Sequence, residues 1–283
     1  MADAPAAGVL VMAYGTPAGP EDIEAYYTHI RRGRPPTPEQ LADLQGRYEA
    51  IGGVSPLLER TRAQADALQA VLGEGFRVEL GMKHAAPFIE DGLASLGGTD
   101  PVIGLVLAPH YSRLSVGEYA ARAGSGVTMV ESWHLEPGYI DLLARSVKEA
   151  GGFDEVVFTA HSLPARTIAE GDPYPRQLEE TAQAVAERAG VDRWSVAWQS
   201  AGRTPEPWIG PDILEVLRSR SGSVLVCPAG FVSDHLEVLY DLDIEAAQLA
   251  SDLGLRFART PMPNDDPDFV ATLAGVVRRA AGE

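Results

Sequence analysis

Residues 155–164 read EVVFTAHSLP, and this stretch decides the fold. Its first six residues form a near-continuous apolar run, which is typical of a parallel strand covered on both faces. A polar turn that contains His161 and ends at Pro164 follows directly. Residues 8–17, GVLVMAYGTP, repeat the arrangement with Tyr14 at the start of the turn. The two matching strand-and-turn units predict a chain built from two similar halves.

The same alternation continues along the chain. Further short apolar runs, which we expect to be strands, lie at 77–83, 102–108, 127–133, 194–200, 223–229 and 255–260. Amphipathic segments, which we expect to be helices, lie at 56–73, 87–97, 137–150, 174–190, 211–221, 233–253 and 266–281. Strands that alternate with helices indicate βαβ units and a doubly wound parallel sheet. Eight strands would also fit a closed barrel.

The internal repeat favours two open sheets over a barrel. The first half is longer than the second because it holds a polar excursion marked by Pro and Gly at residues 29–56. We therefore expect an α/β fold of two Rossmann-like domains, each a four-stranded parallel sheet flanked by helices, with a cleft between them. The first domain covers 1–134 and the second 135–264. Residues 131–137 form the crossover, and a last helix within 265–283 packs back on the first domain.

Composition excludes several classes of protein. The 283 residues carry a net charge of −17, so a nucleic acid or an anionic membrane is an unfavourable partner. The apolar runs are far shorter than the roughly 20 residues that span a bilayer. The start MADAPAAG has no basic segment before its apolar run, so we expect no signal peptide and a cytoplasmic protein. The single cysteine, Cys227, excludes an internal disulfide and is expected to be a buried small hydrophobe.

Ligands of open α/β sheets bind at the carboxyl ends of the strands. This rule selects Tyr14, Lys83, His84, His110, Ser132, His161, Ser162, Gln199, Ser200 and residues 230–233 as candidates. If the two halves face each other, Tyr14 and His161 approach one ligand from opposite sides. A neutral His161 imidazole could ligate a transition metal or accept a proton, although it could also cap the next turn. His84 and His110 could equally be supporting or turn-capping residues.

An acidic helix is predicted after the seventh strand. Ser233 gives an N-cap signal, and about twenty residues without Gly or Pro follow it. Glu237, Asp241 and Glu245 are spaced four residues apart and would share one face of this helix. Such a stripe can be a solvated acidic surface. Because Glu237 follows a strand end at the cleft, the stripe could instead bind or conduct a divalent cation.

A basic cluster stands out in this acidic chain. Residues 29–34, HIRRGR, are followed by Arg47 and Tyr48 within the excursion. Arginine grips carboxylates through a bidentate fork, so the excursion is expected to meet an anionic ligand rather than to be a charge-balanced loop. The chain lacks the GxGxxG, GxxxxGK[ST] and GxSxG motifs, which excludes dinucleotide, P-loop and hydrolase interpretations.

These motifs together resemble the ferrochelatase family, and most closely its coproporphyrin III ferrochelatases of Gram-positive bacteria. The resemblance extends nearly end to end, through VMAYGTP, EDIEAYYTHIRRGR, RYEAIGGVSPL, LAPHYS, TAHSLP, DPYP, WQSAGRTPEPWIGPD and GFVSDHLEVLYDLDIEA. It implies two flavodoxin-like halves around a porphyrin cleft. It also implies a lyase that inserts Fe²⁺ into a porphyrin, coproporphyrin III to give coproheme, in heme biosynthesis.

The resemblance also implies roles for particular residues. His161 and Glu237 would form the metal-insertion pair on one porphyrin face, and Tyr14 would meet the iron from the other face. Asp241 and Glu245 match an acidic line that resembles a metal entry route or second metal site, which could take Mg²⁺. The positions that match those holding the macrocycle and its propionates are Arg31, Arg47, Tyr48, Ser55 and Tyr119, together with Tyr14.

Fe²⁺ is expected as a substrate, with no permanently bound cofactor. Some family members bind a [2Fe–2S] cluster through four cysteines, which the single Cys227 cannot do. The expected partner is the porphyrin, with no nucleic acid, no stable membrane insertion, and transient contact with other heme-pathway enzymes. Alternatives are protoporphyrin IX as the substrate, Co²⁺ or Ni²⁺ as the metal, and a non-catalytic tetrapyrrole carrier. A periplasmic binding protein is disfavoured by the missing signal peptide.

Overall fold

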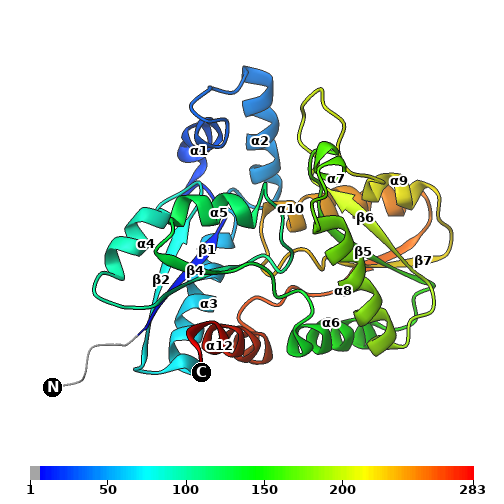
Figure 1. The fold of residues 1–283 in the computed structure, drawn as a ribbon. Coiled ribbons are helices and arrows are strands. Elements are labelled where there is room, and N and C mark those ends of the chain that lie inside the picture. Colours follow the sequence, from blue (N-terminus) through cyan, green and yellow to red (C-terminus); the bar gives the residue numbers. More distant parts are fainter. Residues whose placement is uncertain (1–6) are drawn as a thin grey trace.

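The computed structural model describes residues 7–283. Residues 1–6, on which the signal-peptide expectation and the start of the first predicted domain depend, lie outside this range. The described chain holds two separate four-stranded sheets in which every strand pairing is parallel (Figure 1). Two separate sheets exclude the barrel alternative and confirm the predicted α/β class.

The two sheets have the same strand order. The first sheet has the order β2-β1-β3-β4 and the second the order β6-β5-β7-β8, so β1 and β5 occupy equivalent places. The predicted strands are confirmed with small shifts at their ends; the predicted strand 127–133, for example, ends at Val130. The strands are β1 (Ala7–Ala13), β2 (Phe76–Met82), β3 (Val102–Val106), β4 (Val127–Val130), β5 (Glu155–His161), β6 (Trp194–Gln199), β7 (Ser223–Cys227) and β8 (Arg256–Arg259).

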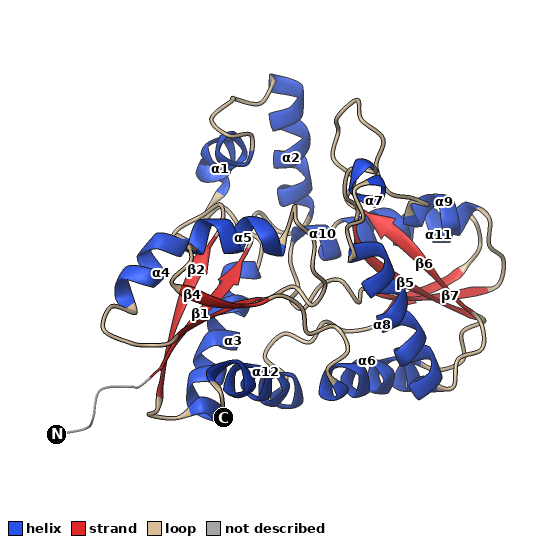
Figure 2. Ribbon diagram, viewed as in Figure 1, coloured by secondary structure: helices blue, strands red, loops and turns tan. Residues whose placement is uncertain are grey.

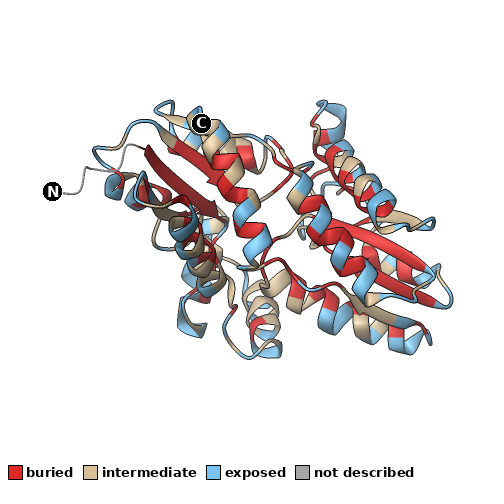
Figure 3. Cartoon of the chain, turned by 90° about the horizontal axis from the view of Figure 1, so that it is seen from below, coloured by how far each residue is buried: buried red, intermediate tan, exposed pale blue. Residues whose placement is uncertain are grey.

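Helices flank both sheets (Figure 2), and buried residues are concentrated in the strands and on one side of many of the helices (Figure 3). Helices were predicted for α3 (Leu57–Leu72), α4 (Ile89–Ser95), α6 (Pro137–Ala150), α8 (Tyr174–Ala189), α9 (Ile213–Arg218) and α12 (Pro267–Ala281), and all are confirmed. The sequence analysis did not predict η1 (Pro20–Asp22), α1 (Ile23–Ile30), α2 (Pro38–Ala50), α5 (Val116–Ala123) or α7 (Arg166–Ala169). Helix α2 and the end of α1 lie in the excursion at residues 29–56, and both helices project from the first half (Figure 1).

The predicted single α-helix over 233–253 is wrong in two respects. The helical segment begins at Leu236 after an extended His235, so Ser233 is not its N-cap. Ser233 instead donates a hydrogen bond to Gln64 across the molecule (3.1 Å). The segment also divides into α10 (Leu236–Leu239), a π-helical turn η2 (Asp241–Ala246) and α11 (Ala247–Asp252). π-Helical turns are rare and occur frequently at functional sites.

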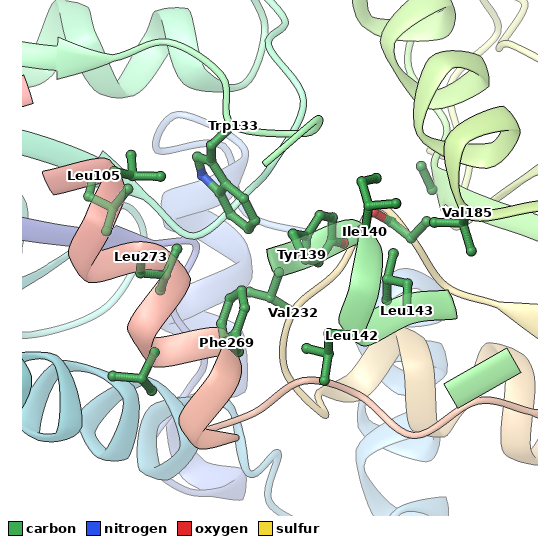
Figure 4. Packing of buried hydrophobic residues seen from close by; sticks show 14 of the residues in the cluster. Leu105, Trp133, Tyr139, Ile140, Leu142, Leu143, Val185, Val232, Phe269 and Leu273 are labelled. Carbon is green, nitrogen blue, oxygen red and sulfur yellow. Dashed lines mark hydrogen bonds between the residues drawn. The ribbon is translucent and has the colours of Figure 1, made fainter. Parts of the chain in front are cut away.

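A large hydrophobic cluster joins the two halves beneath the sheets (Figure 4). Its centre holds the aromatic rings of Trp133, Tyr139 and Phe269, with centroids 5.0–6.2 Å apart. The hydroxyl of the buried Tyr139 has a hydrogen-bond partner, because it donates to the carbonyl of Ala229 (2.9 Å). Helix α12 contacts α3, β3 and β4 as well as α6. The domain boundaries at 134 and 264 stay a prediction.

Replacing Phe269 by Ala should lower the free energy of unfolding by about 3–5 kcal/mol, because the ring is fully buried and its loss leaves a cavity. Urea unfolding followed by circular dichroism measures the change. Arg279→Ala, on the exposed side of the same helix, is the control and should cost less than about 1 kcal/mol. Equal losses in the two variants would show that α12 does not join the core as described.

Candidate active site

A cleft of about 750 Å³ lies between the two halves, at the carboxyl ends of their strands. Its volume is in the range of small-molecule sites. Tyr14 and Tyr119 line it from the first half, and His161 and Glu237 line it from the second. The chain positions Tyr14 and His161 at equivalent strand ends, directly after β1 and at the last residue of β5. The cleft thus places the two predicted strand-end residues at one site.

His161 and Glu237 form a charged pair on the second wall of the cleft. His161 Nε2 lies 3.4 Å from Glu237 Oε1, and His235 Nε2 lies 3.6 Å from the other carboxylate oxygen. The His161 Nδ1–H donates to the carbonyl of Ser162, and the His161 carbonyl accepts from the Tyr174 hydroxyl (3.0 Å). These contacts fix the ring and leave Nε2 directed at the carboxylate.

The environment gives this pair strongly shifted pKa values. Burial alone would lower the pKa of His161, but the Glu237 carboxylate outweighs it and raises the pKa to about 9. Burial likewise opposes the ionised form of Glu237, yet His161 and His235 hold its pKa well below the usual range. Near neutral pH the pair is therefore an ion pair between the His161 imidazolium and the Glu237 carboxylate.

Tyr14 occupies the other side of the site. Gly15 follows it with a φ of 95°, a conformation that favours glycine and lets the chain turn directly after β1. Tyr14 lines the cleft, and 42% of the residue is exposed. Burial of the hydroxyl, and next the Glu237 carboxylate, raise the pKa of the phenol, so it stays protonated near neutral pH.

The acidic stripe lies at the cleft but is not a solvated face along its whole length. Asp241 is buried, whereas Glu245 is exposed, and both line the cleft with Glu237. Asp241 accepts a hydrogen bond from Ser200, and its Oδ1 lies 3.4 Å from the guanidinium of Arg47. Burial and the nearby Glu237 carboxylate raise the pKa of Asp241 to about 7. No basic residue within this helical segment offsets the repulsion between its carboxylates. The positive charge that offsets it is that of Arg47, on α2 of the other half.

Five of the six residues predicted to hold the macrocycle line the cleft, namely Tyr14, Arg47, Tyr48, Ser55 and Tyr119. Tyr48 is buried and hydrogen-bonded to Thr16 (3.2 Å). Arg31 is not among the residues that line the cleft. Its Nε donates a hydrogen bond to the carbonyl of Arg34 (3.2 Å). Its role stays a prediction.

Several lining residues were missed in the sequence. Arg32 lines the cleft where Arg31 was expected, although both belong to the basic cluster. Glu118 lies on the unpredicted helix α5, next to the predicted Tyr119, and Trp208 lies in the loop after β6. Sequence position cannot separate Arg31 from Arg32, because the helix end at Ile30 decides which side chain faces inward.

Over residues 7–283, no three or more His, Cys, Asp or Glu side chains are grouped to hold a metal ion. Within the same range, no helix has the length and apolar character needed to cross a membrane.

Comparisons with known proteins agree with one another. The family model described as Ferrochelatase matches residues 6–281. The coproporphyrin III ferrochelatase of Anoxybacillus flavithermus is 49% identical over 298 residues, which cover 95% of this chain and 95% of the relative. That of Bacillus subtilis is 46% identical over 303 residues, which cover 97% and 98%.

Replacing Glu237 by Gln should bring the pKa of His161 from about 9 to below 6.5, because burial then acts without the opposing carboxylate. Histidine side-chain NMR across pH measures both values. Since the folded-state pKa is raised, the pair stabilises the wild type fully below pH 6.5 and loses this contribution as pH rises to about 9.

Glu237→Gln should therefore remove that part of the pH dependence of unfolding. Glu245→Gln is the control, because Glu245 is exposed and is not among the groups that raise the pKa of His161. A pKa that stays near 9 in Glu237→Gln would contradict the assigned cause.

Proposed function

The chain belongs to the ferrochelatase family, and we propose that it inserts Fe²⁺ into coproporphyrin III to give coproheme in heme biosynthesis. The observation that carries the proposal is the His161–Glu237 pair, which faces Tyr14 across a cleft between two parallel sheets. The names of the relatives support coproporphyrin III as the porphyrin.

The pair suits the two demands of the reaction. A porphyrin must lose two pyrrole protons and gain a divalent metal, and imidazole and carboxylate are ligands for such metals. Glu237 keeps its negative charge over the working pH range because its pKa is depressed. His161 must lose its proton before Nε2 can bind metal or accept a pyrrole proton. A two-donor pair leaves the remaining coordination positions of the iron to the porphyrin nitrogens.

Asp241 and Glu245 are proposed to form the route by which the metal enters the cleft and the released protons leave it. The negative charge of Glu237 helps to raise the pKa of Asp241 to about 7, and this pKa lets Asp241 exchange a proton near neutral pH. Glu245 lies at the exposed end of the same segment. The two carboxylates are also the place where Mg²⁺ would bind as a second metal.

Tyr14 is proposed to face the iron from the opposite side of the ring. Its protonated hydroxyl and the walls around it offer a rigid surface on which a buckled macrocycle fits better than a flat one. A buckled ring exposes nitrogen lone pairs, so the binding energy of the remote parts of the porphyrin contributes to metal insertion.

Arg47, Tyr48, Ser55 and Tyr119 are proposed to hold the ring and its propionates, with Arg31 as a further anchor. Arg47 pairs with Asp43 (3.3 Å) and Asp241 (3.4 Å). A porphyrin carboxylate that binds Arg47 would take the place of Asp241 and leave that carboxyl available to the metal route. The enzyme is proposed to act in the cytoplasm, where transient contacts would pass the porphyrin between enzymes.

The test of the proposed function is anaerobic Fe²⁺ insertion, followed by absorbance, with coproporphyrin III and protoporphyrin IX in parallel. Turnover that prefers coproporphyrin III is the expected result. Preference for protoporphyrin IX would change the substrate assignment. Tight binding of both porphyrins without turnover would contradict the enzyme assignment and favour a non-catalytic tetrapyrrole carrier.

His161→Ala should lower the rate of iron insertion at least about 100-fold, because the variant loses both a metal donor and a base. The Kd for coproporphyrin III, measured by fluorescence quenching, should stay within about threefold. His134→Gln is the control, since His134 pairs with Glu180 away from the cleft and its loss should leave the rate within about twofold. Full activity of His161→Ala would remove His161 from the mechanism.

Arg31→Ala should raise the Kd for coproporphyrin III about fivefold if Arg31 turns from the Arg34 carbonyl to a propionate. The same binding assay on Arg34→Ala, a neighbouring exposed arginine, should show no change. Identical affinities in all three proteins would assign the contact to other cations of the excursion.

A further inference from the structure

We propose that Tyr174 is a positioning residue for metal insertion, which holds His161 in place from the contact between the two halves. The inference rests on the proposed function, since it names how the metal-insertion pair is kept in position. It also gives a role to two sequence motifs that the proposed chemistry does not use, LAPHYS at 107–112 and DPYP at 172–175. The motifs belong to different halves and contact each other.

Tyr174 is packed against rings from both halves. It begins α8, lines the cleft and is only 7% exposed. Its ring centre lies 5.5 Å from that of Trp198 in β6 and 6.1 Å from that of His110, which follows β3. Packing against these two rings leaves the Tyr174 ring little freedom, so the direction of its hydroxyl is fixed.

The Tyr174 hydroxyl holds the peptide that follows His161. It donates to the carbonyl of His161 (3.0 Å), and the Ser162 amide of the same peptide donates to the carbonyl of Gln199 (2.7 Å). Both polar groups of this peptide are therefore engaged. The next carbonyl, that of Ser162, accepts the His161 Nδ1–H. The orientation of this short backbone segment consequently determines where His161 Nε2 lies relative to Glu237.

Asp172 connects Tyr174 to the first half. Its Oδ1 accepts from the Tyr174 amide (3.0 Å), and its Oδ2 accepts from Ser112 Oγ and from the Arg113 amide (2.9 Å each). Asp172 is buried, so its carboxylate depends on these donors. Ser112 and Arg113 belong to the first half, on the loop after β3. This loop therefore fixes the start of α8, and with it the backbone of Tyr174.

His110 gives the same loop a second hold on α8. The residue is 1% exposed, and its Nε2 lies 2.9 Å from the hydroxyl oxygen of Thr181. The Thr181 hydroxyl donates its one hydrogen to a backbone carbonyl, that of His134 or Gln177, so it accepts from a protonated Nε2. Burial, and then the neighbouring His134, lower the pKa of His110 to about 3, so the ring is neutral. A neutral ring with a fixed tautomer thus packs edge-on against Tyr174.

The position of His161 matters because one atom has two tasks. Nε2 is proposed to bind Fe²⁺ and to accept a pyrrole proton, and both tasks require it to stay at a defined place in the cleft. Residues that orient a metal ligand without touching the metal typically change metal affinity or activity about 10–100-fold when they are mutated. Tyr174 acts in this way through the backbone of His161, and Asp172 acts through Tyr174.

Tyr174→Phe keeps the ring and removes the hydroxyl, so it tests positioning with little change in packing. We expect the kcat for iron insertion to fall about 10-fold and the KM for Fe²⁺ to rise at least about threefold, because Nε2 is less well placed. The Kd for coproporphyrin III, measured by fluorescence quenching, should stay within about twofold, since the groups proposed to hold the macrocycle are unchanged.

Tyr139→Phe is the matched control. It also removes a buried hydroxyl that donates to a backbone carbonyl of the second half, that of Ala229 (2.9 Å), but Tyr139 is not among the described residues that line the cleft. Both variants should lose a similar amount of thermal stability, whereas the kcat and the KM for Fe²⁺ of Tyr139→Phe should stay within about twofold of the wild type.

Ser112→Ala tests the connection to the first half. The variant removes one donor to Asp172 and should lower kcat about threefold. Combined with Tyr174→Phe, it should lower kcat no further than Tyr174→Phe alone, because both changes act along the same series of contacts.

Wild-type kcat and KM for Fe²⁺ in Tyr174→Phe would overturn the inference, as would equal losses of activity in Tyr139→Phe. Weaker binding of coproporphyrin III with an unchanged kcat would make Tyr174 a porphyrin contact instead. Losses that multiply in the double variant would contradict the role of the inter-half contact. These outcomes are separate from the proposed function, which fails only if the wild type inserts no iron.

Discussion

The cleft exists because hydrogen bonds between the two halves hold their strand ends at a fixed separation. The loop after β3 contacts the start of α8 in the other half. Ser112 Oγ and the Arg113 amide both donate to Asp172 Oδ2 (2.9 Å each), and the Tyr111 amide donates to Gln177 (2.7 Å). Asp172 is buried, so losing these donors would leave a carboxylate without partners in a low-dielectric place. The inter-half contact is consequently expensive to open.

The same contact also fixes the chemistry on the second wall. The other oxygen of Asp172 accepts from the Tyr174 amide (3.0 Å), and the Tyr174 hydroxyl donates to the carbonyl of His161. A continuous set of hydrogen bonds thus connects the first half to the backbone of the proposed base. On the far side of the cleft, Gln64 donates to the carbonyls of Val232 (3.1 Å) and Asn264 (2.8 Å). A rigid frame of this kind is what a mechanism based on ring distortion requires.

Sequence reasoning succeeded where local patterns determine structure. Apolar runs marked the strands, and the strand-end rule placed Tyr14 and His161 at one cleft. It failed where distant contacts decide. The cation that pairs with Asp241 is Arg47, which lies 194 residues away in the chain, so the spacing of residues within one helix could not reveal this pair. The π-helical turn was missed for a related reason, since its stability depends on the packing of Leu242 and Ala246 in the second core.

The two halves share one strand order but give the cleft two walls with different charged side chains. Carboxylates outnumber cations on the second wall, which carries Asp212, Glu237, Asp241 and Glu245 beside Arg166 and Arg203. Cations outnumber carboxylates on the first wall, which carries Arg32, Arg47 and Lys83 beside Asp43 and Glu118. An acidic protein can bind an acidic porphyrin only if its cations are concentrated where the carboxylates arrive. A metal ion needs the opposite environment. Because equivalent strand ends carry different side chains, the porphyrin carboxylates and the Fe²⁺ are attracted to different walls of one cleft. The macrocycle between those walls is therefore the only place where the two attractions meet.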